Sequence, residues 1–182
     1  MPRQVVTVGT GVALLGLTSF GYLSVVGRVL GPADVVPLTT LWVLINAIGP
    51  ALFFPLEQEV GRAVAARQAV GLGARPVLLR AAALGLGLLL VLAAVCAAAG
   101  APLSRWLFDG EVVVLAAFFV GSVGLCAQHL TRGSFAGTGD FLRYGVQLGT
   151  DGLLRLASAT APRRRSVGTP YCSASRHSSR SS

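Results

Sequence analysis

Four long apolar runs, separated by short polar stretches, constrain this chain more than any other feature. They cover about residues 5–27, 35–56, 77–99 and 112–130. A bilayer core takes about 20 mostly apolar residues in helical form, because backbone groups must satisfy one another where water is absent. Hydrophobic residues make up 53% of the chain and charged residues only 12%. The sequence therefore predicts an all-α, polytopic transmembrane helical bundle rather than a water-soluble domain.

A fifth segment, residues 144–161, leaves the number of spans at four or five. Asp151 and Arg155 interrupt it, and a charge at the centre of a membrane helix costs about 2.5–3.5 kcal/mol on insertion scales. The two side chains are spaced i,i+4, so they can pair on one helical face and lessen that cost. The predicted transmembrane region accordingly covers residues 1–156.

The distribution of arginines predicts a cytoplasmic N-terminus. In that orientation only Arg28 and Arg105 fall outside, and the positive-inside rule favours the face with more arginines. The predicted location is the cytoplasmic membrane, with several passes through the lipid bilayer. The cytoplasmic face would receive Arg3, Arg62, Arg67, Arg75, Arg80, Arg132 and Arg143.

Residues 157–182 form a basic tail rich in serine and arginine, with no acidic residue and no apolar run. This composition is typical of a disordered segment. It also accounts for most of the net charge of +8. Because the basic residues are not gathered with aromatic residues on a soluble face, no nucleic-acid partner is predicted. The abrupt loss of apolar patterning after about residue 157 further suggests the hypothesis of a truncated or frameshifted product.

The second apolar run contains two prolines, Pro50 and Pro55. Proline lacks an N–H donor, so the Gly49-Pro50 pair should bend or locally unwind this helix. Membrane helices tolerate such a break where neighbouring helices or a wet cavity satisfy the freed carbonyls. Asn46, one turn earlier, is a polar group at membrane depth. It predicts either a hydrogen bond between helices or a position in a cavity wall.

Beyond Pro55 the helix is expected to continue as an amphipathic extension along the cytoplasmic surface. The apolar positions keep helical spacing there. Glu59 and Arg62 can pair at i,i+3. For Glu57 and Glu59, a solvated helix end is favoured over a role with substrate or protons.

No motif in the chain predicts an enzyme. The sequence GTGVAL, residues 9–14, begins like a dinucleotide fingerprint, but Leu14 stands where the third glycine belongs and no strand precedes it. The three cysteines share no ligand spacing and only two histidines are present, which argues against a metal site. We therefore predict no catalytic residue, no cofactor and no metal.

Two stretches resemble the first part of oligosaccharide flippases, the polysaccharide-export branch of the multidrug, oligosaccharidyl-lipid and polysaccharide exporter superfamily. The first is RVLGPADVVPLTTLWVLINAIGPALFFPLEQEVGRAVAAR, residues 28–67, which is similar to the opening hairpin of that family. The second is HLTRGSFAGTGDFLRYGVQLGTDGLLRL, residues 129–156, which is similar to its fourth-to-fifth helix connection. The aromatic residue that often follows the aspartate of the first turn is replaced here by Val35.

This resemblance implies an exporter that works by alternating access around a central cavity between two pseudo-symmetric lobes. The chain would supply part of one lobe and associate with a missing second lobe or with itself. The implied cargo is lipid-linked oligosaccharide or polysaccharide precursor, and arginine suits its diphosphate. The polar candidates for the cavity or its gates are Arg28, Asn46, Glu57, Glu59, Asp151 and Arg155.

Two alternatives remain open at this stage. One is a cation-coupled drug exporter of the same superfamily, which needs a membrane-embedded carboxylate; the first four apolar runs contain none. The other is a small membrane scaffold or interaction protein without cargo, for which packed helices and a basic tail suffice.

Overall fold

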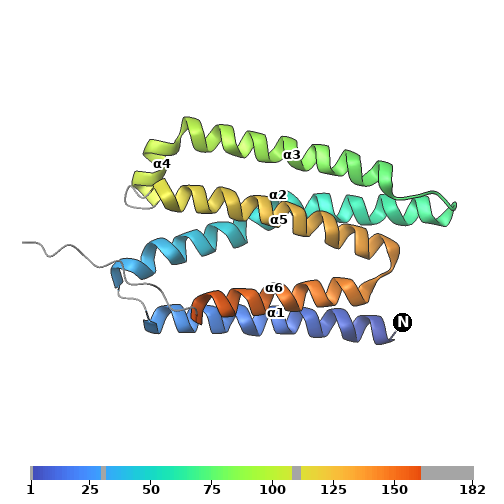
Figure 1. The fold of residues 1–182 in the computed structure, drawn as a ribbon, viewed down its shortest axis with the longest axis horizontal. Helices are drawn as coiled ribbons and strands as arrows, with labels where there is room; N and C mark the ends of the chain where they lie inside the picture. The colour runs from blue at the N-terminus through green and yellow to red at the C-terminus, as the bar shows by residue number, and fades with distance from the viewer. Residues whose placement is uncertain (1, 30–31, 108–111, 161–182) are drawn as a thin grey trace, which may run out of the picture.

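The computed structural model describes residues 2–29, 32–107 and 112–160. These residues confirm the predicted all-α fold, and Figure 1 shows the long helices running along the long axis of the bundle. Residues 161–182 of the predicted tail lie outside the described residues, whereas residues 157–160 belong to the last helix. The helices are α1 (Pro2–Val29), α2 (Pro32–Ala69), α3 (Arg75–Ala98), α4 (Gly100–Leu107), α5 (Val112–Thr138) and α6 (Phe141–Thr160).

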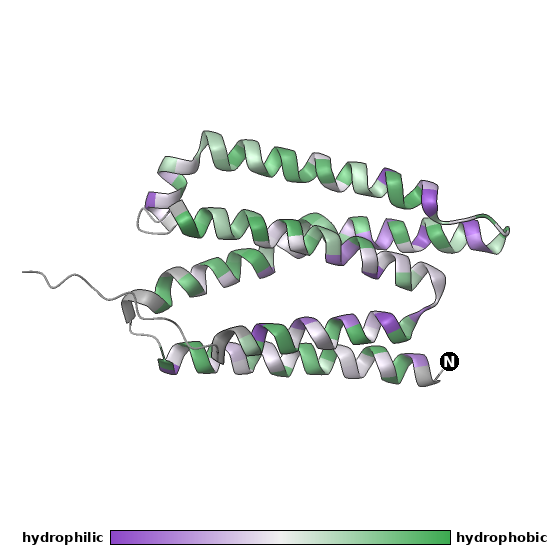
Figure 2. Cartoon of the chain, in the orientation of Figure 1, coloured by the Kyte–Doolittle hydropathy of each residue, from purple (hydrophilic) through white to green (hydrophobic). Residues whose placement is uncertain are grey.

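Four of these helices, α1, α2, α3 and α5, are long and apolar enough to cross a membrane. The chain is therefore a multi-pass membrane protein. Figure 2 shows hydrophobic residues along most of α3 and more hydrophilic residues in α6. Helix α6 does not reach the apolarity of the other four, yet it lies alongside α1 over its length (Figure 1). Its polar residues must therefore be accommodated inside the bundle.

Several helix boundaries differ from the predicted ones. Helix α2 is one element of 38 residues, which confirms the predicted extension, and its two halves are inclined to each other (Figure 1). Such a bend is expected at Pro50. Helix α5 runs to Thr138, so Arg132 lies within a helix with a buried side chain and not in a cytoplasmic connection. The short helix α4 was not predicted.

Helices α2 and α5 run parallel and touch at glycines. A methyl group on Gly133 would lie 2.6 Å from the carbonyl oxygen of Glu57, and one on Gly137 would lie 2.6 Å from Cβ of Val64. Backbones can approach this closely only where a side chain is missing. The glycine spacing seen in the sequence thus packs this pair of helices.

Helices α1 and α6 form a second parallel pair of the same kind. A methyl group on Gly145 would lie 2.8 Å from the carbonyl oxygen of Thr7, and one on Gly152 would overlap the hydroxyl of Thr18. The contacting residues advance together along both helices, from Thr7 and Gly145 to Thr18 and Gly152. The position of a residue in α6 therefore shows which part of α1 it lies beside. Helix α3 packs on the far side of the α2/α5 pair, where Leu89 meets Phe53 and Cys126 in an apolar core.

The turn between α5 and α6 reverses the chain in two residues and so places α6 beside the bundle. Gly139 has a φ of 73°, a conformation that glycine adopts without steric cost. The N–H of Asp140 donates to the carbonyl of Phe135 at 2.9 Å, which ends α5 as in a Schellman motif. The Asp140 carboxylate then accepts from the N–H of Arg143 at 3.1 Å and caps α6.

Gly137→Ala should weaken the bundle, because the added methyl group meets Val64 and the carbonyl of Gly61, 2.7 Å away. We expect a loss of about 1–3 kcal/mol, typical of overpacking. Gly87→Ala is the matched control, since a methyl group there meets no atom within 4 Å. Thermal unfolding of both variants in the same detergent measures the difference; an equal midpoint for the two would contradict the assigned α2/α5 contact.

Candidate functional site

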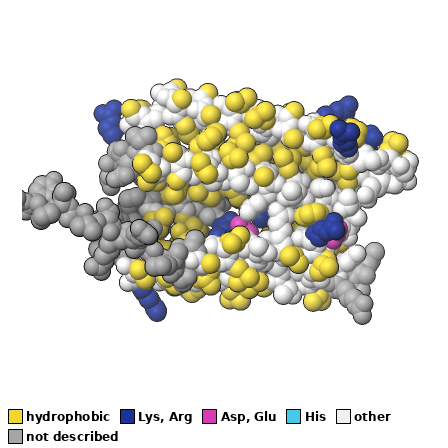
Figure 3. All heavy atoms as spheres, viewed as in Figure 1, with side chains coloured by type: hydrophobic (Ala, Val, Ile, Leu, Met, Phe, Trp, Pro, Cys, Tyr) yellow, Lys and Arg dark blue, Asp and Glu magenta, His cyan; other side chains and the backbone are white. Residues whose placement is uncertain are grey.

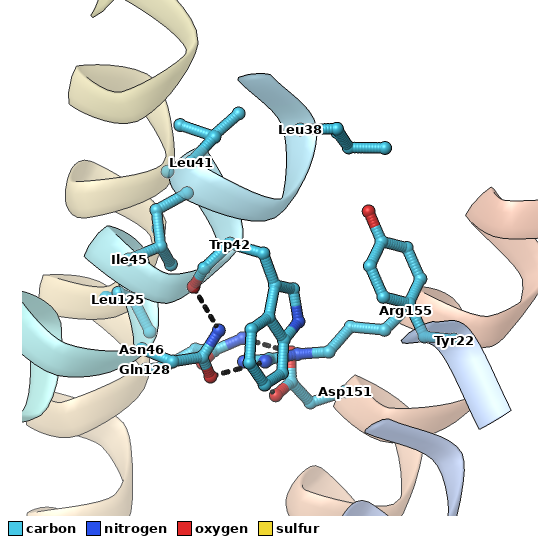
Figure 4. Close-up of a pocket in the computed structure, with 12 residues that line it drawn as sticks. Tyr22, Leu38, Leu41, Trp42, Ile45, Asn46, Leu125, Gln128, Asp151 and Arg155 are labelled. Atoms are coloured by element: carbon cyan, nitrogen blue, oxygen red, sulfur yellow. Dashed lines mark hydrogen bonds and ion pairs between the residues drawn. The ribbon is translucent and has the colours of Figure 1, made fainter. Parts of the chain in front are cut away.

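Three polar side chains meet where the α1/α6 pair faces the α2/α5 pair. Arg155 donates from Nη1 to Oδ1 of Asn46 at 3.0 Å, and its Nη2 lies 2.9 Å from Oδ2 of Asp151. The last contact confirms the i,i+4 pair predicted for this helix. Figure 4 shows these side chains converging between the helices. Asn46, Asp151 and Arg155 are thus brought together from two helices that are far apart in sequence.

Helix α5 adds two further side chains to this cluster. Gln128 donates to Oδ1 of Asp151 at 2.9 Å, and its amide oxygen accepts from Arg132 at 3.2 Å. Nη2 of Arg132 lies 3.9 Å from Oδ2 of Asp151. The side chain of Asp151 is only 12% exposed, and a buried carboxylate is stable when cations and hydrogen-bond donors compensate it in this way.

The cluster is level with the middle of α1, one of the four helices that are long and apolar enough to cross a membrane. Gly149 of α6 is level with Leu14 of α1, and Gly152 is level with Thr18. The apolar run that contains these α1 residues covers about positions 5–27. Asp151 is consequently close to its midpoint, where an isolated charge would be most costly.

A cavity of about 250 Å³ adjoins the cluster. In the space-filling view of Figure 3, acidic and basic side chains are visible in a hollow between the two halves of the molecule. Charged, amide, aromatic and aliphatic groups line the cavity together, so it can contact both polar and apolar parts of a ligand. Its polar and aromatic lining comes from Tyr22, Trp42, Asn46, Gln128, Asp151 and Arg155.

A second polar centre joins the helix pairs closer to the N-terminal end of α1. Glu57 Oε2 lies 2.6 Å from Nδ1 of His129, and Tyr144 donates to Glu57 Oε1 at 2.9 Å. The side chains of Glu57 and His129 are 4% and 5% exposed. The prediction of a solvated helix end is therefore wrong for Glu57, because one helical face of the extension packs against α5 and α6.

The remaining predicted site residues lie apart from both centres. Glu59 is exposed and forms a bidentate pair with Arg62 at 2.6 and 2.9 Å, as predicted from their spacing. Arg28 is exposed in the last turn of α1. Neither residue reaches the cavity wall. Glu57 lies one residue beyond the second predicted run, within the candidate span Leu38–Ala69, and its side chain is buried.

Sequence reasoning missed several residues that the fold brings to these centres. His129 and Gln128 lie one and two positions before the predicted end of the fourth run, and Trp42 was passed over as part of an apolar segment. One signal was present in the sequence: Gln128, His129 and Arg132 are three polar residues within one helical turn and a half, which is unusual in a membrane helix.

Among residues 2–29, 32–107 and 112–160, no group of three or more His, Cys, Asp or Glu side chains is placed to hold a metal ion. Comparisons with protein-family models, with curated proteins and with solved structures find no match to this chain.

Glu57→Leu should destabilise the protein, because His129 and Tyr144 would each lose a buried hydrogen-bond partner. We expect a cost of about 2–5 kcal/mol. Glu59→Leu makes the same change two positions away on an exposed side chain, where the ion pair with Arg62 contributes little. Denaturation of the two variants in detergent compares them directly. A smaller effect at position 57 than at position 59 would contradict the buried contact.

Proposed function

We propose that this chain acts as, or forms part of, an exporter of lipid-linked oligosaccharide or polysaccharide precursors across the cytoplasmic membrane, with a cytoplasmic N-terminus. One observation carries the proposal: a cavity lies between two helix pairs at the level of the middle of α1, and its largely apolar wall carries Asn46, Gln128, Asp151 and Arg155. A hydrophilic cargo needs polar groups at this depth, where an isolated charge is costly. The proposed cargo class is taken from the resemblance of residues 28–67 and 129–156 to oligosaccharide flippases.

The contacts between the helix pairs differ in kind from those within each pair, and this difference supports alternating access. Within each pair, backbones touch at glycines such as Gly137 and Gly145. Between the pairs, side-chain hydrogen bonds predominate, for example Tyr144 to Glu57 and Arg155 to Asn46. Water or cargo hydroxyls can take the place of the partner in such bonds. We therefore expect the pairs to move as rigid units about the cavity.

In this proposal the pathway is completed by a second lobe or by a second copy of the chain. The cavity is bordered by α1, α2, α5 and α6. In exporters with two pseudo-symmetric halves, the cargo site lies where the halves meet. The partner would supply the wall that faces these helices.

Proteoliposomes that contain the purified chain should flip a lipid-linked oligosaccharide whose terminal sugar carries a fluorescent label. The measured quantity is the rate at which the protected label becomes accessible to a membrane-impermeant quencher. Asp151→Asn leaves the Arg155 guanidinium without its carboxylate, so we expect flipping to slow by about tenfold or more. Arg80→Gln changes an exposed arginine of α3 and should flip at the parent rate.

The elution profile and unfolding temperature of each variant show whether it has folded before its rate is compared. A parent rate equal to that of protein-free vesicles would contradict the proposal. Equal flipping rates for Asp151→Asn and Arg80→Gln would show that flipping does not depend on the cavity.

A cation-coupled drug exporter is the second candidate, favoured by the burial of two carboxylates, Glu57 and Asp151. Such carboxylates could bind a coupling proton. On our proposal, an imposed pH gradient should drive no uptake of ethidium into proteoliposomes. Gradient-driven uptake that is lost in Glu57→Gln and retained in Glu59→Gln would contradict the flippase proposal and support the drug exporter.

A further inference from the structure

We infer that the mid-membrane cavity binds an uncharged sugar ring, stacked on Trp42, and not the diphosphate of a lipid-linked cargo. This inference rests on the proposed function, because a sugar reaches this depth only when the protein carries a lipid-linked saccharide. Three properties of the cavity support it: its charge balance, its unpartnered indole and its size.

The charges that line the cavity compensate each other. Arg155 is engaged by Asp151 at 2.9 Å and by Asn46 at 3.0 Å. A diphosphate would have to pull the guanidinium away from a carboxylate that is only 12% exposed, which is costly in a low-dielectric site. Hydroxyl groups both donate and accept, so they can bind to the remaining lone pairs of Asn46 and Asp151 without separating the ion pair.

Trp42 supplies the second property. Its indole N–H is buried and has no hydrogen-bond partner among the described residues. A buried donor left unpaired costs about 1–3 kcal/mol, so an oxygen of the ligand in the cavity would stabilise it. Figure 4 shows the indole in front of the polar cluster, with Tyr22 also at the cavity. The apolar C–H face of a pyranose packs on such a ring while its hydroxyls reach the polar groups.

The cavity is also of suitable size. Its volume of about 250 Å³ far exceeds the share of about 30 Å³ that one water takes in the liquid. It falls just below the range of about 300–1,000 Å³ found for drug-sized ligands. One sugar ring fits these limits, whereas an entire oligosaccharide does not.

The test uses the full chain in nanodiscs, which avoids glycosidic detergents. Trp106→Phe removes the other tryptophan, an exposed residue, so all indole emission then reports on Trp42. The probes are a short prenyl diphosphate that carries a disaccharide, and the same prenyl diphosphate without sugar. We expect the saccharide probe to shift the emission of Trp42 and to bind about tenfold tighter or more, the value of one or two added hydrogen bonds.

Two substitutions at position 42 distinguish the contribution of the indole N–H to binding from that of the ring. Calorimetry measures the affinity of each variant for both probes. Trp42→Phe keeps a ring and should weaken binding of the saccharide probe by about threefold to tenfold. Trp42→Leu removes the ring and should abolish the preference over the bare diphosphate. Phe54→Leu is the matched control, because Phe54 is a half-exposed aromatic residue on the same helix and should leave both affinities unchanged.

The outcomes distinguish this inference from the function on which it rests. If the bare prenyl diphosphate binds as tightly as the saccharide probe and both are flipped, the sugar site is wrong and the proposed function stands. If neither probe binds and neither is flipped, both fail. If Trp42→Leu retains the preference for the saccharide probe, the sugar does not stack on Trp42 and the inference is overturned.

Discussion

Close contact between helix backbones at glycine residues determines the arrangement of this protein. In lipid, apolar side chains gain little by turning inward, because the hydrocarbon around them is equally apolar. Helices then associate through van der Waals packing at close range. Gly133 and Gly137 bring α5 onto α2, and Gly145 and Gly152 bring α6 onto α1. Both pairs are parallel, and the two-residue turn between α5 and α6 links them at the end of the bundle where the N-terminus lies (Figure 1).

The polar residues of the bundle are located where these two glycine-packed pairs meet. Glu57 contacts His129 and Tyr144, and Asp151 contacts Arg155 and Gln128. Each carboxylate is thus matched by donors from other helices or from its own. A buried charge without such partners would cost several kcal/mol, so these contacts favour the register that the two pairs have in this structure.

Local patterns predicted the helices and the pairs within one helix, but not the contacts between helices. The four apolar runs, the extension beyond Pro55 and the pairs Glu59–Arg62 and Asp151–Arg155 all follow from spacing along a single helix. The contact between Glu57 and His129 joins residues 72 positions apart, and no single-helix pattern encodes it. Glu57 and Glu59 are chemically identical and two positions apart, yet one is buried and the other exposed. Their difference depends on which face of α2 meets α5 and α6.

Helix α6 shows why the charges of a helix must be counted together with their partners. Averaging residue by residue counts Asp151 and Arg155 as two separate penalties, each of about 2.5–3.5 kcal/mol. The physical cost depends on the pair, because a carboxylate 2.9 Å from a guanidinium retains much of the stabilisation that water would have provided. Asn46 and Gln128 satisfy further lone pairs and protons of the same two groups. A helix can therefore lie at membrane depth with two charges when neighbouring helices present the complementary groups at the same level, and the partner that makes this possible here is the α2/α5 pair.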